Sequence, residues 1–231
     1  MLNQPAGDTL RSYLPKNFDN VFLLERALTH RSYLNERRDA LEDNERLEFL
    51  GDSILGFIVA EWVYHNFPEK KEGFLTKIRS ALVHTGKLSE LARSIELGPA
   101  LLLGKGEVAA GGNDRDAILC DAFEALIAAM FLSTDLKTVR DFITPMLEKE
   151  TEKILKERSE EDSKSLLQEW AQSQGFSSPN YQTIAQRGPD HSKTFLVEVM
   201  INNKVIGQGI GSSKQNAEKS AASAALKCLN L

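Results

Sequence analysis

Residues 44–53 read Asn-Glu-Arg-Leu-Glu-Phe-Leu-Gly-Asp-Ser, and their acidic residues recur at the spacing of a helix. Glu45, Glu48 and Asp52 are three and four residues apart, so a helix places them on one stripe. Like charges at these spacings repel each other and mildly destabilise a helix. Solvent can screen this repulsion, and a bound divalent cation can neutralise it. The stretch predicts an acidic helix face that is either solvated or half of a metal site.

A second acidic pair lies on a segment that should be buried. Residues 118–128 read Ile-Leu-Cys-Asp-Ala-Phe-Glu-Ala-Leu-Ile-Ala, and a helix that is apolar almost all round is typical of a protein interior. Asp121 and Glu124 share a face of this helix, although carboxylates are seldom buried unless they are paired or bind metal. Two such helices facing each other would form a pocket whose oxygen ligands suit Mg²⁺ or Mn²⁺ better than Zn²⁺.

The composition is that of an ordinary globular protein. The chain has 231 residues, of which 42% are hydrophobic and 26% charged, so we expect one or two domains. The first residues lack the basic and apolar regions of a secretory signal, and the longest apolar run, Ala125–Leu132, is too short to span a bilayer. Cys120 and Cys228 form no disulfide framework or zinc-site spacing, and Cys120 is expected as a small buried hydrophobe. These features predict a cytoplasmic protein without a membrane partner.

The charge is unevenly distributed along the chain. A net charge of −5 at first disfavours nucleic acid as a partner. Residues 162–231, however, contain seven Lys or Arg against five Asp or Glu, whereas residues 1–161 contain 21 against 28. The sequence therefore predicts an acidic part that holds the carboxylates and a weakly basic part that is a separate binding module.

Hydrophobic spacing up to about residue 150 predicts helices. The helix with the first acidic stripe should end at Pro68, and Thr76–Ile95 should form one further helix. Residues 104–116 are rich in glycine and charge, which predicts a loop. A last amphipathic helix is expected over Leu136–Leu155, and Pro145 should kink or divide it.

The pattern changes to period-two alternation after residue 175. Phe195, Val197, Val199 and Ile201 should share one face of a strand, and Asn202-Asn203 should form a tight turn. The expected order is a helix over Ser163–Ser173, strands over Tyr181–Gln186, residues 195–201 and Lys204–Gly211, and an Ala-rich helix over Ser213–Leu229.

Four motifs in this order resemble those of the bacterial ribonuclease III family: Thr29-His30-Arg31-Ser32-Tyr33, Asn44–Ser53, Gly104-Lys105-Gly106 and Ile118–Ala125. The C-terminal module resembles a double-stranded-RNA-binding domain, and together the two resemblances cover nearly the whole chain. They imply an all-α endonuclease domain over residues 4–155 and a charged linker over 156–161. A small α+β domain of α-β-β-β-α order, which binds double-stranded RNA, is implied over 162–231.

The resemblance implies a homodimer that uses Mg²⁺, or Mn²⁺ in its place, to cut both strands of double-stranded RNA. The expected products carry 5′-phosphate and 3′-hydroxyl ends with short 3′ overhangs, and precursor ribosomal RNA and messenger RNA are expected substrates. The chemistry fits, because two metal ions can activate water and stabilise the leaving alkoxide without a histidine base. Residue by residue, the resemblance makes Glu48, Asp52, Asp121 and Glu124 metal ligands, Asp52 and Glu124 catalytic, Glu45 a supporting acid and Phe49 a plug into the partner subunit.

The second domain should contact RNA at three places, because duplex RNA is recognised mostly by shape across its grooves. The resemblance assigns Lys164, Gln168 and Glu169 to the first contact, His191 to the second and Lys214 to a phosphate clamp. Gln215 and Glu218 stand where the strongest binders carry lysines, so we expect modest affinity and a shallow salt dependence.

Several alternatives remain open from the sequence. The chain could be a non-catalytic scaffold that binds double-stranded RNA, or a structural metal-binding helical protein with an appended interaction module. His30 could be a general base, a metal ligand or a structural residue, and Lys105 could contact phosphate or lie in a solvated loop. Phe49 could belong to the core instead of the dimer contact. Gly51, in mid-helix, predicts close approach of a neighbouring backbone.

Overall fold

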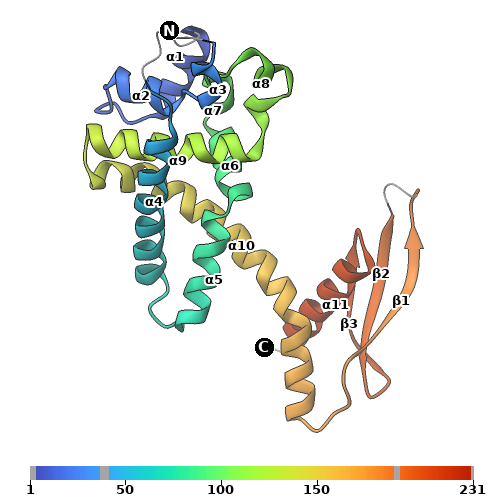
Figure 1. Cartoon of the computed structure of the whole chain (residues 1–231). Coiled ribbons are helices and arrows are strands. Elements are labelled where there is room, and N and C mark those ends of the chain that lie inside the picture. The colour runs from blue at the N-terminus through green and yellow to red at the C-terminus, as the bar shows by residue number, and fades with distance from the viewer. Residues whose placement is uncertain (1–3, 37–41, 190–192, 230–231) are drawn as a thin grey trace. The chain divides into compact units, whose positions relative to one another are not determined.

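The computed structural model describes residues 4–36, 42–189 and 193–229, and the chain divides into two compact units (Figure 1). The first unit is Met1–Thr151 and the second is Glu152–Leu231. The first is helical and the second contains a three-stranded antiparallel sheet with helices, which confirms the predicted fold class. None of the helices in the described part is both long and apolar enough for a membrane span.

The first unit is built around α9, which is buried along nearly its whole length. Helices α2, α4 and α6 pack against it, and Figure 1 shows α9 crossing among them. Twelve residues of α9, among them Phe123 and Leu126, are buried.

The elements are α1 (Gln4–Tyr13), α2 (Val21–Ala27), α3 (Arg31–Leu34), α4 (Glu45–Asn66), α5 (Glu72–Val83), α6 (Thr85–Ser94), α7 (Leu97–Ala100), α8 (Lys105–Ala109), the 3₁₀ turn η1 (Gly112–Asp114), α9 (Asp116–Ser133) and α10 (Leu136–Ser173).

Gly51 is where α4 and α9 touch most closely. A Cβ atom built on Gly51 would lie 1.8 Å from the carbonyl oxygen of Glu124 and 2.4 Å from its carbonyl carbon. No side chain fits at such distances, since even the smallest would overlap backbone atoms that cannot turn away. The predicted close approach of a neighbouring backbone is confirmed, and the neighbour is the residue that carries the buried acid.

Two predictions of regular structure in this unit were wrong. Thr76–Ile95 is not one helix, because His84 is extended with ψ 153° and separates α5 from α6. The Nδ1 atom of His84 accepts a hydrogen bond from the Lys87 backbone N–H at 3.2 Å and so caps α6. The periodicity missed the break because both helices bury residues at the same spacing. The predicted loop at residues 104–116 contains the short α8 and η1.

Helix α10 continues where the sequence predicted a division and a linker. It runs from Leu136 to Ser173 with Pro145 inside it, and it includes residues 156–161. Pro145 was predicted to kink or divide the helix, and the helix is not divided there. A proline removes one backbone hydrogen bond, and the many other bonds of a helix this long remain. The boundary between the two units falls inside α10, between Thr151 and Glu152.

The second unit pairs its strands in the order β1-β2-β3 and covers one face of the sheet with α11. Val197, Val199 and Ile201 are buried on one face of β2, as predicted. Asn202 and Asn203 have φ of 50° and 63°, which confirms the predicted tight turn. The elements are β1 (Asn180–Arg187), β2 (Thr194–Ile201), β3 (Lys204–Gly211) and α11 (Lys214–Cys228), and the predicted first helix is the end of α10.

Small residues on both sides allow β3 to lie directly on α11. A Cβ atom on Gly209 would lie 2.1 Å from the backbone nitrogen of Ala221, and Gly207 meets Ala225 in the same way. The alternate positions of a strand share one face, and residues four apart share one face of a helix. The alanine content of α11 is therefore explained by packing against glycine, with Ala217, Ala221 and Ala225 fully buried.

Replacing Gly51 by alanine should destabilise the protein by more than about 2 kcal/mol, because the added methyl group must separate α4 from α9. Gly56 is the matched control, since it lies on the same helix and a Cβ there would meet nothing within 4 Å. Gly56→Ala should be neutral or stabilising by up to about 1 kcal/mol, as alanine is the better helix former. Urea unfolding of both variants measures this, and equal stabilities would contradict the close contact.

Candidate functional site

The acidic cluster forms where α4 crosses α9. Because Gly51 touches the backbone of Glu124, the residues beside it, Glu48 and Asp52, are brought to the acids of α9. Each of the charges of Glu48, Asp52 and Asp121 acts on Glu124. The structure therefore brings four of the acids that the sequence singled out within range of electrostatic interaction.

Glu124 is the most buried member of the cluster, with an exposed fraction of 9%. Burial, and after it the charges of Asp52, Asp121 and Glu48, together raise the pKa of its carboxyl to about 7. The pKa of Glu48 is also raised, first by burial and then by the charges of Asp121, Glu45 and Asp52. The groups around these carboxylates therefore do not provide enough positive charge to balance their negative charge.

His30 and Glu45 lie at the margin of the cluster. Burial raises the pKa of Asp121, while the charge of His30 lowers it and the charge of Glu45 raises it. Glu45 is exposed, and its Oε1 lies 3.5 Å from Nη1 of Arg31. The Nδ1 atom of His30 accepts a hydrogen bond from the Ser32 backbone N–H at 3.2 Å, which caps α3. The structural interpretation of His30 is therefore supported, and its charge also acts on Asp121.

Cys120 is the functional candidate that the sequence analysis missed. Its Sγ donates a hydrogen bond to Oε1 of Glu124 over 3.8 Å, and the thiol is buried as predicted. Burial, and then the charges of Glu124 and Asp121, raise its pKa to about 12. Among the described residues, Cys120, Asp121 and Glu124 form a group whose donor atoms all lie within 4.8 Å of one another. The i, i+4 spacing of Cys120 and Glu124 was a signal for this contact.

The donor set of the cluster fits a hard divalent cation. Glu48, Asp52, Asp121 and Glu124 offer carboxylate oxygens, which Mg²⁺ and Mn²⁺ prefer, and Glu124 is buried among the other three charges. A buried carboxylate in such a setting is stabilised when a cation is bound. The cluster is therefore suited to a metal ion, whereas a merely solvated acidic face would leave all of its acids exposed.

Phe49 is the exposed neighbour of the cluster on α4. Its side chain is 78% exposed, so Phe49 does not belong to the core of its own chain. Phe57 and Tyr64 follow on the same helix with exposed fractions of 53% and 66%. An aromatic residue of this kind is suited to a contact with another molecule.

The candidate RNA contacts of the second unit differ in their surroundings. Gln168, Glu169 and Lys214 are exposed, and Lys214 occupies the first turn of α11. Lys164 is half-buried, because its ammonium lies 2.6 Å from Oε2 of Glu218 and 4.5 Å from the centre of the Tyr181 ring. His191 lies outside the described residues.

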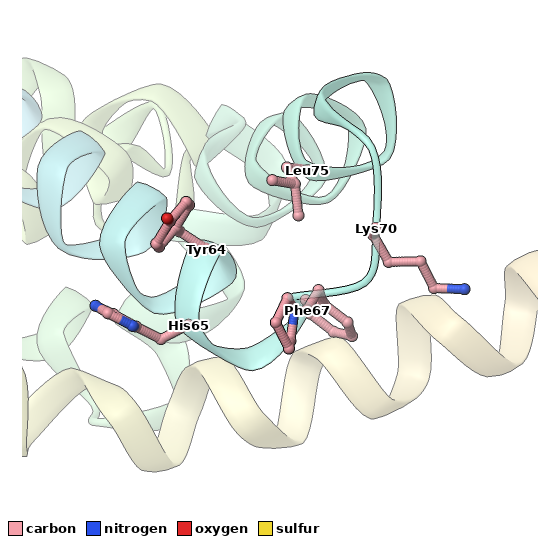
Figure 2. A pocket seen from close by; sticks show the side chains of 6 residues that line it. Tyr64, His65, Phe67, Lys70 and Leu75 are labelled. Atoms are coloured by element: carbon pink, nitrogen blue, oxygen red, sulfur yellow. The ribbon is translucent and has the colours of Figure 1, made fainter.

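A separate hollow at the turn between α4 and α5 lacks the chemistry of the acidic cluster. It has a volume of about 180 Å³ and contains no carboxylate, and Figure 2 shows Tyr64, His65 and Phe67 around it. Twelve residues of helix separate Asp52 from Tyr64, which corresponds to roughly 18 Å. The hollow is therefore not part of the site.

Comparison with known proteins identifies both units. The ribonuclease-III-like family matches residues 20–151, and the double-stranded RNA binding motif matches residues 163–229. Ribonuclease 3 of Roseiflexus sp. is 44% identical over 225 residues, which are 96% of this chain and 95% of that protein. Ribonuclease 3 of Natranaerobius thermophilus is 42% identical over 208 residues, 90% of each chain.

The solved nuclease domain of ribonuclease III from Campylobacter jejuni, in which one region is involved in dimer formation, is similar in structure and sequence. Its TM-score is 0.56 at 36% identity, and the match covers 62% of this chain and 96% of that one. Both matched families, the two relatives and the acidic cluster at the α4–α9 contact agree. The chain belongs to the ribonuclease III family, with a ribonuclease-III-like domain followed by a double-stranded RNA binding motif.

Proposed function

We propose that this ribonuclease III uses Mg²⁺ to hydrolyse both strands of double-stranded RNA. Endonucleolytic cleavage of double-stranded RNA is the activity of its family and of the relatives named ribonuclease 3. The observation that carries the metal proposal is the burial of Glu124 among three further carboxylates. The products would carry 5′-phosphate and 3′-hydroxyl ends with short 3′ overhangs, and Mn²⁺ would replace Mg²⁺.

Each acid has a proposed role at this site. Glu48, Asp52, Asp121 and Glu124 would hold the metal, and Asp52 and Glu124 would act at the reacting phosphate. The chemistry that Mg²⁺ supplies when bound is stabilisation of charge on phosphate oxygens and activation of water. Rigid packing of α4 on α9 fixes the spacing of the four carboxylates before RNA arrives, which lowers the cost of organising them later. Glu45, exposed at the margin, would add negative charge that strengthens metal binding.

The two domains would divide binding from chemistry. We propose an endonuclease domain over residues 4–155, a connecting segment over 156–161 and an RNA-binding domain over 162–231. Gln168, Glu169, Lys214 and His191 would contact duplex RNA, while Lys164 would do so only beside its ion pair with Glu218. Precursor ribosomal RNA and messenger RNA in the cytoplasm are the proposed substrates.

The nuclease domain would act as a homodimer. Support comes from the exposure of Phe49 and from the Campylobacter jejuni nuclease domain, which has a region involved in dimer formation. An aromatic side chain that is 78% exposed next to the acidic cluster would be buried by a second copy of the chain.

Glu124→Gln should abolish cleavage of a perfect RNA duplex in Mg²⁺ while leaving RNA binding within about twofold. The amide keeps the shape of the side chain but removes the charge that binds metal. Glu61→Gln is the matched control, because Glu61 lies on α4 and pairs with Arg140 away from the cluster. A gel with and without Mg²⁺ measures both activities. Wild-type turnover by Glu124→Gln would refute the site, and binding without cleavage by the wild type would support the scaffold alternative.

The same substitution should stabilise the protein at high pH when divalent cations are absent. The folded-state pKa of Glu124, about 7, exceeds its ordinary value of 4.5, so the native state holds the proton more tightly than the unfolded state. Stability of the wild type should therefore fall as pH rises from 4.5 to 7. Above pH 7 the Gln variant should be more stable by on the order of 2 kcal/mol.

Thermal unfolding in a chelating buffer at several pH values measures this difference. Added Mg²⁺ at pH 8 should stabilise the wild type more than the variant, because binding to the native state raises stability. If the stabilities of the two proteins changed with pH in parallel, the charged form of Glu124 would not be destabilised by its neighbours.

Lys214→Gln should weaken binding to duplex RNA and reduce the slope of log K against log salt by about one. Lys227, in the last turn of α11, is the matched control, and Lys227→Gln should change neither quantity. Titrations by fluorescence anisotropy at several salt concentrations measure both. An unchanged slope for Lys214→Gln would remove this lysine from the RNA contact.

A further inference from the structure

The carboxylate of Glu124 is repelled by its neighbours and held by a thiol. Within the described residues it accepts a hydrogen bond from Cys120, with 3.8 Å between Sγ and Oε1. The exposed fractions of the two residues are 6% and 9%, so both side chains are largely shielded from solvent. The other groups that act on Glu124 are the carboxylates of Asp52, Asp121 and Glu48, which disfavour its charge. Of the groups in the described part of the chain that act on Glu124, the thiol is the one that favours its charged form.

A second helix supports the same thiol. Thr85, the first residue of α6, lies near the Cys120 side chain, where its hydroxyl acts to lower the pKa of the thiol. Helix α6 packs against α9, so this contact is part of the helix interface. A thiol is both a weak donor and a weak acceptor, which allows it to accept from the hydroxyl and donate to the carboxylate. Thr85, Cys120 and Glu124 therefore form a chain that starts outside α9.

Other roles for Cys120 fit the structure less well. A reactive cysteine is accessible and stabilised as a thiolate, whereas this thiol is buried and faces carboxylates, which keep it protonated. A residue that only fills space would need no donor aimed at Glu124. The remaining role is that of a group that orients a neighbouring side chain.

We infer that Cys120 is a positioning residue, whose thiol orients the carboxylate of Glu124 towards the metal-binding cluster with Thr85 behind it. This inference rests on the proposed function, in which Glu124 binds the metal. Groups that hydrogen-bond to metal-binding side chains commonly change metal affinity by about 10- to 100-fold when removed. Because a thiol is a weak donor, we expect the lower end of that range.

The test compares Cys120→Ala and Cys120→Ser in the full-length protein. Cys120→Ala should raise the Mg²⁺ concentration for half-maximal cleavage about tenfold. It should equally raise the Mg²⁺ concentration needed for half of the thermal stabilisation in the absence of RNA. Cys120→Ser keeps a donor and should return both values to within about twofold of the wild type. Binding of duplex RNA in a chelating buffer should not change, and Cys228→Ala, on exposed Cys228, should leave every value unchanged.

Thr85 allows a second, independent measurement. Thr85→Val removes the hydroxyl at nearly constant shape and should raise the Mg²⁺ requirement less than Cys120→Ala does. In the Cys120→Ala background it should have no further effect, because residues of one hydrogen-bonded chain are coupled. Full additivity of the two substitutions would contradict the chain. If Cys120→Ala fails to fold, Cys120→Ser and Thr85→Val still carry the test.

The outcomes separate this inference from the proposed function. If Cys120→Ala and Cys120→Ser lower the melting temperature but leave the Mg²⁺ requirement within twofold, or raise it equally, Cys120 does not position Glu124. If the wild type neither cleaves duplex RNA in Mg²⁺ nor is stabilised by Mg²⁺, the proposed function itself fails. If the Cys120 variants behaved like the wild type while Glu124→Gln was inactive, the inference about Cys120 would be overturned and the proposed function would stand.

Discussion

The contact between the backbone of Gly51 and the backbone of Glu124 is the constraint on which the site depends. A Cβ atom at Gly51 would overlap the Glu124 carbonyl, so only glycine allows α4 and α9 to approach this closely. This close approach brings Glu48 and Asp52 near Asp121 and Glu124. Rigid packing of the two helices then holds these residues in place. Separation of these helices by one methyl group would change the distances between the acids of α4 and those of α9.

The packing of α4 on α9 concentrates negative charge at a place where few positively charged groups lie nearby. Glu124 is buried with a pKa of about 7, and the pKa values of Glu48 and Asp121 are raised as well. A fold tolerates such unfavourable charge where function requires it, and the proposed metal ion would convert the repulsion into affinity. At its border the thiol of Cys120 donates a hydrogen bond to Glu124, and the charge of His30 lowers the pKa of Asp121.

The second unit shows the same use of small residues for a different purpose. Glycines on β3 allow α11 to lie directly on the sheet, and the buried alanines of α11 complete the contact. The ion pair of Lys164 with Glu218 joins the end of α10 to α11, so this lysine has a structural partner besides any RNA phosphate. Gln168 and Lys214 are exposed, and none of the described side-chain hydrogen bonds or ion pairs involves either residue.

The amino-acid sequence by itself determined the three strands and most of the long helices, which acids share a helix face, and that Gly51 needs a close neighbour, because these follow from local spacing and side-chain size. It also determined the two-domain organisation and the family through ordered motifs. Only the tertiary structure decided that this neighbour is Glu124, that Thr76–Ile95 breaks at His84, and that Cys120 donates to Glu124. These outcomes depend on contacts between distant segments and on the direction of side chains, which one-dimensional periodicity does not contain.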